Sequence, residues 1–200
     1  MHDRHSTNKP THFFLYGCHV ACIGQKKTLR FPDLLNTIKE YCKPAAQTFI
    51  LNAEVVAIDR KNGHKLMSFQ ELSSRERGSK DSLITVDRIK VDICVFVLDI
   101  MFANGQQLLG FPLRQRRKCL KDLFQDEKLG HFEYAKEITV EANDACFTSE
   151  TTLTRINSFL EDALQFSCEG IMVKSLDTDA GYLPSKRGDT WLKVVFTGIF

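Results

Sequence analysis

Two short stretches of the sequence place a carboxylate beside an apolar run. In "SCEGIMVKSLD", residues 167–177, Glu169 precedes the run at 171–173, and in "FILNAEVVAI", residues 49–58, Glu54 interrupts the run. Apolar runs of this length favour strands covered on both faces, although a piece of buried helix stays open. Burial of an unpaired carboxylate is costly, so each acid needs a cation, hydrogen-bond donors or water beside it.

A lysine near the end of the chain could supply positive charge. Lys193 follows Trp191 in "TWLKV", a further strand candidate. Glu169 and Lys174 have opposite parity on one strand and are not expected to pair. Two strand carboxylates and a strand lysine facing a common cleft would suit a nucleoside triphosphate, because acids hold Mg²⁺ or ribose hydroxyls and lysine neutralises phosphate. Three separate surface ion pairs are the alternative.

Composition indicates a folded globular protein with one sizeable core. The chain has 200 residues, of which 43% are hydrophobic and 26% charged, with a net charge of +2. That charge is too small to predict a nucleic-acid partner. Three local stretches are basic, at 75–80, 114–121 and 185–188, and each is either a binding patch or an ordinary solvated face. Seven cysteines without a Cys-x-x-Cys pair suit a reducing compartment. The apolar stretch at 12–24 is too short to span a membrane.

From Phe31 onward, the patterning predicts helices and strands in mixed order. Helices are predicted at 31–41, 111–124 and 151–166, and residues 69–78 are predicted to form a short helix followed by a basic loop. Strands are predicted at 47–59, 91–103, 132–140, 169–174 and 190–196. This order lacks strict alternation, so we predict an α+β fold with mainly antiparallel sheets and flanking helices. Residues 1–30 show no sustained period and form an atypical N-terminal segment, and 196–200 form an atypical tail.

Six motifs follow one another between Phe31 and Val194. They are "ILNAEVVAID", "FQELSSRERG", "ICVFVLDIMFANG", "PLRQRRKCL", "SCEGIMVKSLD" and "WLKV". Together they resemble the adenylation (nucleotidyltransferase) domain of eukaryotic, plant-like ATP-dependent DNA ligases. The resemblance implies that residues 31–195 are part of such a domain, with ATP and Mg²⁺ as cofactors and nicked double-stranded DNA as partner. It also implies a nuclear protein of DNA repair, replication and recombination, without a membrane partner.

The resemblance implies roles for four residues of the nucleotide site. By position, Glu54 matches the acid that contacts ribose and metal, Glu169 a metal-binding acid, and Lys193 the lysine that contacts the α-phosphate. These matches make Glu54, Glu169, Lys193 and Leu98 the predicted ATP-binding residues, and the two acids the predicted metal ligands. Leu98 stands where the family has an aromatic residue that stacks on adenine, and leucine offers apolar contact without a π-face.

Other positions match or depart from the family pattern. Arg75 and Arg77 match a basic stretch for which the resemblance implies a DNA-facing or structural role. Asn52 stands where an aspartate is common, and Val195 where a second phosphate-binding lysine is expected. The 200 residues contain no Asp-Gly pair, so the family's Lys-x-Asp-Gly-x-Arg motif with its nucleophilic lysine is absent from them.

We therefore predict a part of an ATP-dependent DNA ligase that lacks the nucleophile motif and the oligonucleotide-binding barrel. Such a chain should be inactive in ligation on its own and need the missing ligase domains for function. An alternative is a non-catalytic nucleic-acid-binding or interaction module that uses the basic helix at 114–121. A third is an unstable product, because a sheet without the nucleophile strand would have an unpaired edge.

Overall fold

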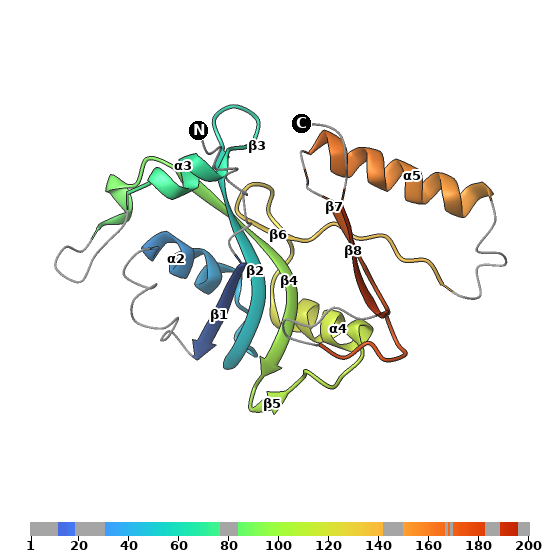
Figure 1. The fold of residues 1–200 in the computed structure, drawn as a ribbon. Helices are drawn as coiled ribbons and strands as arrows, with labels where there is room; N and C mark the ends of the chain where they lie inside the picture. Colours follow the sequence, from blue (N-terminus) through green and yellow to red (C-terminus); the bar gives the residue numbers. More distant parts are fainter. Residues whose placement is uncertain are drawn as a thin grey trace, which may run out of the picture.

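Two sheets of unequal size, with helices around them, form the described part of the chain (Figure 1). The computed structural model describes the backbone of residues 12–18 and, in full, residues 31–76, 84–141, 150–166, 168, 170–182 and 189–195. The helices are α2 (Pro32–Tyr41), α3 (Phe69–Ser74), the short 3₁₀ helix η1 (Val86–Arg88), α4 (Leu113–Leu123) and α5 (Glu150–Gln165). The strands are β1 (His12–Cys18), β2 (Thr48–Asp59), β3 (Lys65–Leu66), β4 (Asp92–Ala103), β5 (Gln106–Gln107), β6 (Phe132–Tyr134), β7 (Gly170–Lys174) and β8 (Trp191–Val195).

The larger sheet is built on the two long strands β2 and β4. They pair antiparallel, β1 pairs with the other edge of β2, and β6 adds to β4 in parallel. The short strands β3 and β5 return from the ends of β2 and β4. The predicted turn after β4 is confirmed: Asn104 and Gly105 both have positive φ, at 48° and 85°, as a two-residue hairpin loop requires. The predicted α+β fold with mainly antiparallel sheets is confirmed.

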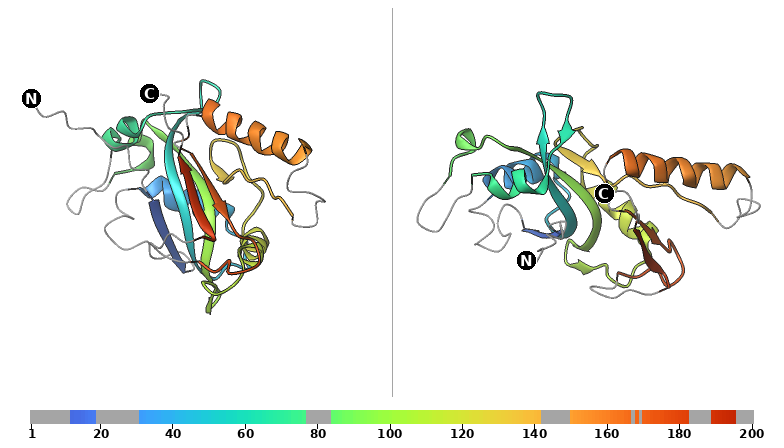
Figure 2. Two further views of the ribbon diagram at one scale, coloured as in Figure 1. Left: turned by 45° about the vertical axis from the view of Figure 1, so that its right-hand side comes forward. Right: turned by 45° about the horizontal axis from the view of Figure 1, so that its top comes forward.

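One face of the larger sheet carries the hydrophobic core. Alternate β2 residues, among them Leu51 and Ala53, are fully buried there, as are their β4 neighbours Val95 and Val97. Helix α2 lies on this face, at the left in Figure 1, and the smaller sheet lies toward the opposite face (Figures 1 and 2). Period-two alternation along β2 thus divides the strand into a core side and a side that faces the smaller sheet.

Local signals at the helix ends match the structure. Helix α2 begins at Pro32, whose fixed φ suits the first helical turn, and α4 begins directly after Pro112. Helix α3 begins at a capping box, in which the Ser68 side chain accepts from the Glu71 backbone and the Glu71 carboxylate accepts from the Ser68 backbone. The two prolines were the signals used to predict α2 and α4, whereas the capping box of α3 was not identified in the sequence.

Three elements differ from their predictions. Residues 12–18, for which no regular element was predicted, form β1 by pairing along β2. Strand β6 is three residues long, whereas 132–140 was predicted. Strand β7 was predicted to be covered on both faces, which is wrong, because Met172 and Val173 are 48% and 47% exposed. The described residues of the smaller sheet form only two strands, so no third strand among them shields β7.

Candidate functional site between the two sheets

A β-bulge decides which residues of β4 face the smaller sheet. Ala53 pairs with Val97, but Asn52 pairs with Asp99, so Leu98 is an extra residue in β4. Residues paired across neighbouring strands share a face of the sheet. Val97 is therefore in the core, whereas Asp99 is turned to the same face as Asn52. The bulge brings a carboxylate into the space beside the smaller sheet.

Asp99 forms a buried ion pair with Arg116 of α4. The guanidinium Nε and Nη2 lie 3.0 and 2.9 Å from Asp99 Oδ1 and Oδ2, and both side chains are almost fully buried. Arg116 Nη1 also donates to the carbonyl oxygens of Phe111 and Ala180. A bidentate pair with additional acceptors satisfies both buried charges. Arg116 therefore connects α4, β4 and the segment that follows β7.

The other arginines of α4 are also paired with acids. Arg114 Nη2 lies 2.8 Å from Asp177 Oδ2 and 2.9 Å from Glu141 Oε1, and Arg117 Nη2 lies 3.5 Å from Glu137 Oε2. The hydrogen bond from Arg114 lowers the pKa of Asp177. The basic helix at 114–121 thus uses its guanidinium groups within the fold. This arrangement weighs against α4 as a nucleic-acid-binding face.

Tyr182, in the segment between β7 and β8, contacts both sheets. Asn52 Nδ2 lies 3.1 Å from the Tyr182 hydroxyl, and the Tyr182 ring meets the Trp191 ring edge-on at 5.2 Å between centroids. Lys174 Nζ lies 4.3 Å from the centre of the Trp191 ring. Burial lowers the pKa of Lys174 to about 8. Trp191 therefore stands on the face of the smaller sheet that looks toward β2.

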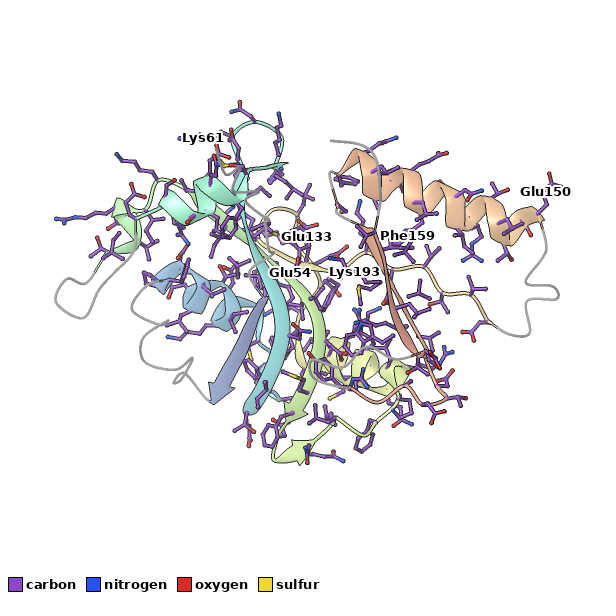
Figure 3. All side chains as sticks on the ribbon, viewed as in Figure 1. Glu54, Lys61, Glu133, Glu150, Phe159 and Lys193 are labelled. Atoms are coloured by element: carbon purple, nitrogen blue, oxygen red, sulfur yellow. The ribbon has the colours of Figure 1, made fainter. Side chains whose placement is uncertain are left out.

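Glu54 and Lys193 come from facing sides of the two sheets. Glu54 lies on the same face of β2 as Asn52, and Lys193 lies on the same face of β8 as Trp191. Figure 3 shows both residues in the space between the sheets. Burial raises the pKa of the Cys168 thiol, and the Glu54 carboxylate raises it further, so Glu54 lies close to the start of β7. The structure thus brings together two of the predicted ATP-binding residues.

The remaining predicted residues are placed differently. Leu98 is the half-buried bulge residue of β4, and Glu169 and Arg77 lie outside the described residues. Arg75 is buried: its Nη2 is 2.7 Å from Asp33 Oδ2, and its guanidinium lies 5.2 Å from the centre of the Phe31 ring. This environment favours the structural role for Arg75 over the DNA-facing one.

Two residues of this face were missed by the sequence analysis. Glu54 pairs with Phe96 of β4, and Phe96 pairs with Glu133 of β6. The three therefore form a row across three strands on the face toward the smaller sheet, and Figure 3 shows Glu133 near Glu54. Phe96 places an aromatic ring on this face, beside Glu54. Alternation along β4 could have placed Phe96 on this face, whereas nothing local indicates the parallel β4–β6 pairing.

Solved structures define the class of this fold. The ligase domain of Mycobacterium tuberculosis LigD matches with a TM-score of 0.59 at 17% identity, covering 94% of this chain and 52% of that one. Mycobacterial DNA ligase D in complex with ATP and MES matches with a TM-score of 0.57 at 16% identity, covering 91% and 50%. The fold is that of a ligase domain, of which this chain covers about half.

Sequence relatives then define the family. The family model for the ATP dependent DNA ligase domain matches residues 23–194, and the chain belongs to this family. It is 64% identical over 177 residues to DNA ligase 6 of Arabidopsis thaliana, covering 88% of this chain and 13% of that protein. DNA ligase 1 of Schizosaccharomyces pombe is 39% identical over 172 residues, covering 86% and 20%. The resemblance read from the motifs is confirmed, and the chain spans a fifth or less of these relatives.

Proposed function

We propose that this chain provides the ATP-binding part of the adenylation domain of a DNA ligase that seals nicks in double-stranded DNA. The observation that carries the proposal is the position of Glu54 and Lys193 on facing sides of the two sheets. An acid on one wall and a lysine on the other suit a nucleotide whose ribose and phosphates lie between them. Family membership supports the same conclusion.

Each residue takes a role that its chemistry permits. The Glu54 carboxylate accepts hydrogen bonds from the ribose hydroxyls, and the Lys193 ammonium neutralises charge on the α-phosphate. Leu98 gives apolar contact to the base, and the half-buried Phe96 adds a π-face beside Glu54.

Magnesium fits this set of donors. Mg²⁺ is commonly held by one or two carboxylates together with substrate phosphates, and no cluster of three or more acidic, histidine or cysteine ligands occurs among the described residues. Glu54 and Glu169 are the carboxylates we assign to it. When bound, the ion would neutralise negative charge on the phosphates.

The adenylation reaction needs more than these residues. In the family, a lysine takes AMP from ATP, AMP passes to the 5′-phosphate at a nick, and the 3′-hydroxyl then displaces AMP. The 200 residues contain no Asp-Gly pair, so this chain does not hold the nucleophile in its family motif. We propose that the chain alone binds ATP without forming an AMP adduct, and that other ligase segments supply the nucleophile and close on the nick.

The family also suggests a cellular location and a set of DNA processes. We propose that the full ligase acts in the nucleus, in repair, replication and recombination of DNA. Arg77 is our candidate for DNA contact in the basic stretch, whereas the buried Arg75, paired with Asp33, is assigned the structural role. None of the described helices is long and apolar enough to span a bilayer.

Calorimetric titration with Mg²⁺-ATP tests the proposal. We expect the 200-residue chain to bind ATP, and Glu54→Ala and Lys193→Ala each to weaken binding by about tenfold or more, which is the usual size for losing a charged contact. Lys118→Ala, an exposed change on α4, is the matched control and should leave binding unchanged. Equal affinities in all four proteins would contradict the assignment. An AMP adduct after incubation with labelled ATP would contradict the claim of inactivity.

A further inference from the structure

Glu133 is an acid on the site face for which the proposed function has no role. It stands on β6 directly beside Phe96, on the side of Phe96 opposite to Glu54. Neighbouring strands are about 4.8 Å apart, so the backbones of the two acids are separated by about 10 Å with the aromatic ring between them. A flat ring with a carboxylate at either end is a suitable surface for a nucleoside.

The fold holds the Glu133 carboxylate in a fixed orientation. Its Oε1 accepts hydrogen bonds from the Gly130 backbone N–H, at 2.8 Å, and from the Cys94 thiol, at 3.4 Å. Burial, with the nearby carboxylate adding to it, raises the pKa of the Cys94 thiol well above its ordinary value, so the thiol keeps the proton that it donates. Both donors reach the same oxygen. The side chain is thus preorganised, with Oε2 the oxygen available to a ligand.

We propose that Glu133 determines base specificity by accepting a hydrogen bond from the exocyclic amine of the nucleotide base that stacks on Phe96. This inference rests on the proposed function, in which Glu54 holds the ribose. If the ribose lies at the Glu54 end of the ring, the far edge of the base lies toward β6 and reaches Glu133.

The chemistry of a carboxylate selects an amino over an oxo group. An ionised carboxylate accepts hydrogen bonds and donates none. The 6-amino group of adenine donates to it, whereas the 6-oxo group of guanine or hypoxanthine presents a lone pair and leaves two acceptors facing each other. A site built on a buried hydrogen bond rejects the analogue that lacks the donor. A glutamine in the same place could donate its amide N–H to the oxo group.

A purely structural role for Glu133 gives a different result. The carboxylate caps the turn before β6 through the Gly130 N–H, so its loss could loosen that turn. Loosening would weaken the binding of every nucleotide alike. The ratio of affinities for ATP and ITP therefore separates the two roles, because these nucleotides differ at the 6-substituent of the purine.

Calorimetric titration of the 200-residue chain with Mg²⁺-ATP and Mg²⁺-ITP is the experiment. We expect the unsubstituted chain to prefer ATP by about tenfold, and Glu133→Gln to reduce that preference to about twofold or less. Glu127→Gln is the matched control, since Glu127 is exposed and bonds to β6 only through the Tyr134 N–H. Glu133→Asp, which keeps the charge but shortens the side chain, should also lower the preference and serves if the glutamine variant does not fold.

The outcomes distinguish the two proposals. No binding of ATP by the unsubstituted chain would overturn the proposed function and this inference with it. Binding of ATP with an ATP to ITP ratio that Glu133→Gln and Glu133→Asp leave unchanged would overturn the role of Glu133 alone. A ratio that falls in the Glu133 variants and stays constant in Glu127→Gln supports it.

Discussion

The two sheets differ in how they are supported, although each contributes one wall of the candidate site. In the larger sheet, residues such as Leu51 and Val97 have no exposed surface and pack into one continuous core. In the smaller sheet, Leu192 and Val194 are 50% and 44% exposed. Burial of apolar surface supplies most of the free energy of folding, so the larger sheet holds most of the stability.

This difference places Glu54 and Lys193 on supports of unequal rigidity. Polar contacts join the segment between β7 and β8 to the rest of the fold, such as those of Arg116 with Ala180 and of Asn52 with Tyr182. Segments with few buried apolar contacts open at a lower free energy than the whole fold.

The largest effect should come from Asp99→Ala, which removes the buried ion pair with Arg116. The change leaves the Arg116 guanidinium buried without its counter-charge, and breaking a buried pair in this way costs about 3–5 kcal/mol. We expect the midpoint of urea unfolding to fall accordingly. Asp87→Ala, at an exposed position in η1, is the control. A loss below about 1 kcal/mol for Asp99→Ala would mean that the pair is not buried in solution.

Gly170→Ala should destabilise the smaller sheet and leave the larger sheet folded. A Cβ at Gly170 would collide with the Val194 carbonyl oxygen of the paired strand, which is backbone and cannot turn away. We expect about 1–3 kcal/mol of strain, loss of hydrogen-exchange protection in β7 and β8, and an intact larger sheet. Gly110→Ala is the matched control, because a Cβ there meets nothing. Equal loss of protection in β2 and β4 would show that the two sheets unfold as one unit.

Two helix starts and the turn after β4 could be read from the sequence because their signals are local. Pro32 and Pro112 indicated helix starts, and Asn104-Gly105 indicated the hairpin turn after β4. The exposure of β7 could not be predicted in the same way. An apolar run shows that a strand can be buried, but it does not show which neighbouring elements cover the strand. Strand β1 was missed since its pairing with β2 leaves no period in its own sequence.

The candidate site was predictable only in part. The positions of Glu54 and Lys193 followed from the family resemblance, and the structure places them on facing walls. The bulge at Leu98 and the pair it creates between Asp99 and Arg116 depend on register, which no single strand specifies. Arg116 was therefore taken for part of a basic surface, although it lies in the interior.

The pH dependence of stability should report whether the smaller sheet is closed. Burial lowers the pKa of Lys174 in the folded chain to about 8, below the value of 10.5 in the unfolded chain. The unfolded state then binds more protons between these values, so Lys174 opposes folding below about pH 8 and this penalty fades as the pH rises toward 10.5. We expect the chain to gain up to about 3 kcal/mol over this range relative to Lys174→Met. Parallel curves for the two proteins would place Lys174 in water and the sheet in an open state.

The smallest effect should come from Arg114→Ala, which removes exposed ion pairs and leaves the hydrophobic core intact. Arg114 joins α4 to Asp177, beyond β7, and to Glu141. Exposed ion pairs contribute little and are screened by salt, so global stability should hardly change. We expect a modest acceleration of amide exchange in β7 and β8 at low ionic strength, with none in β2 and β4. Lys118→Ala on the same helix controls for the lost charge. An acceleration that persists in high salt would show that packing of the Arg114 side chain, and not its ion pairs, stabilises the smaller sheet. No acceleration at low salt would show that the contacts of Arg116 and Tyr182 are sufficient to stabilise it.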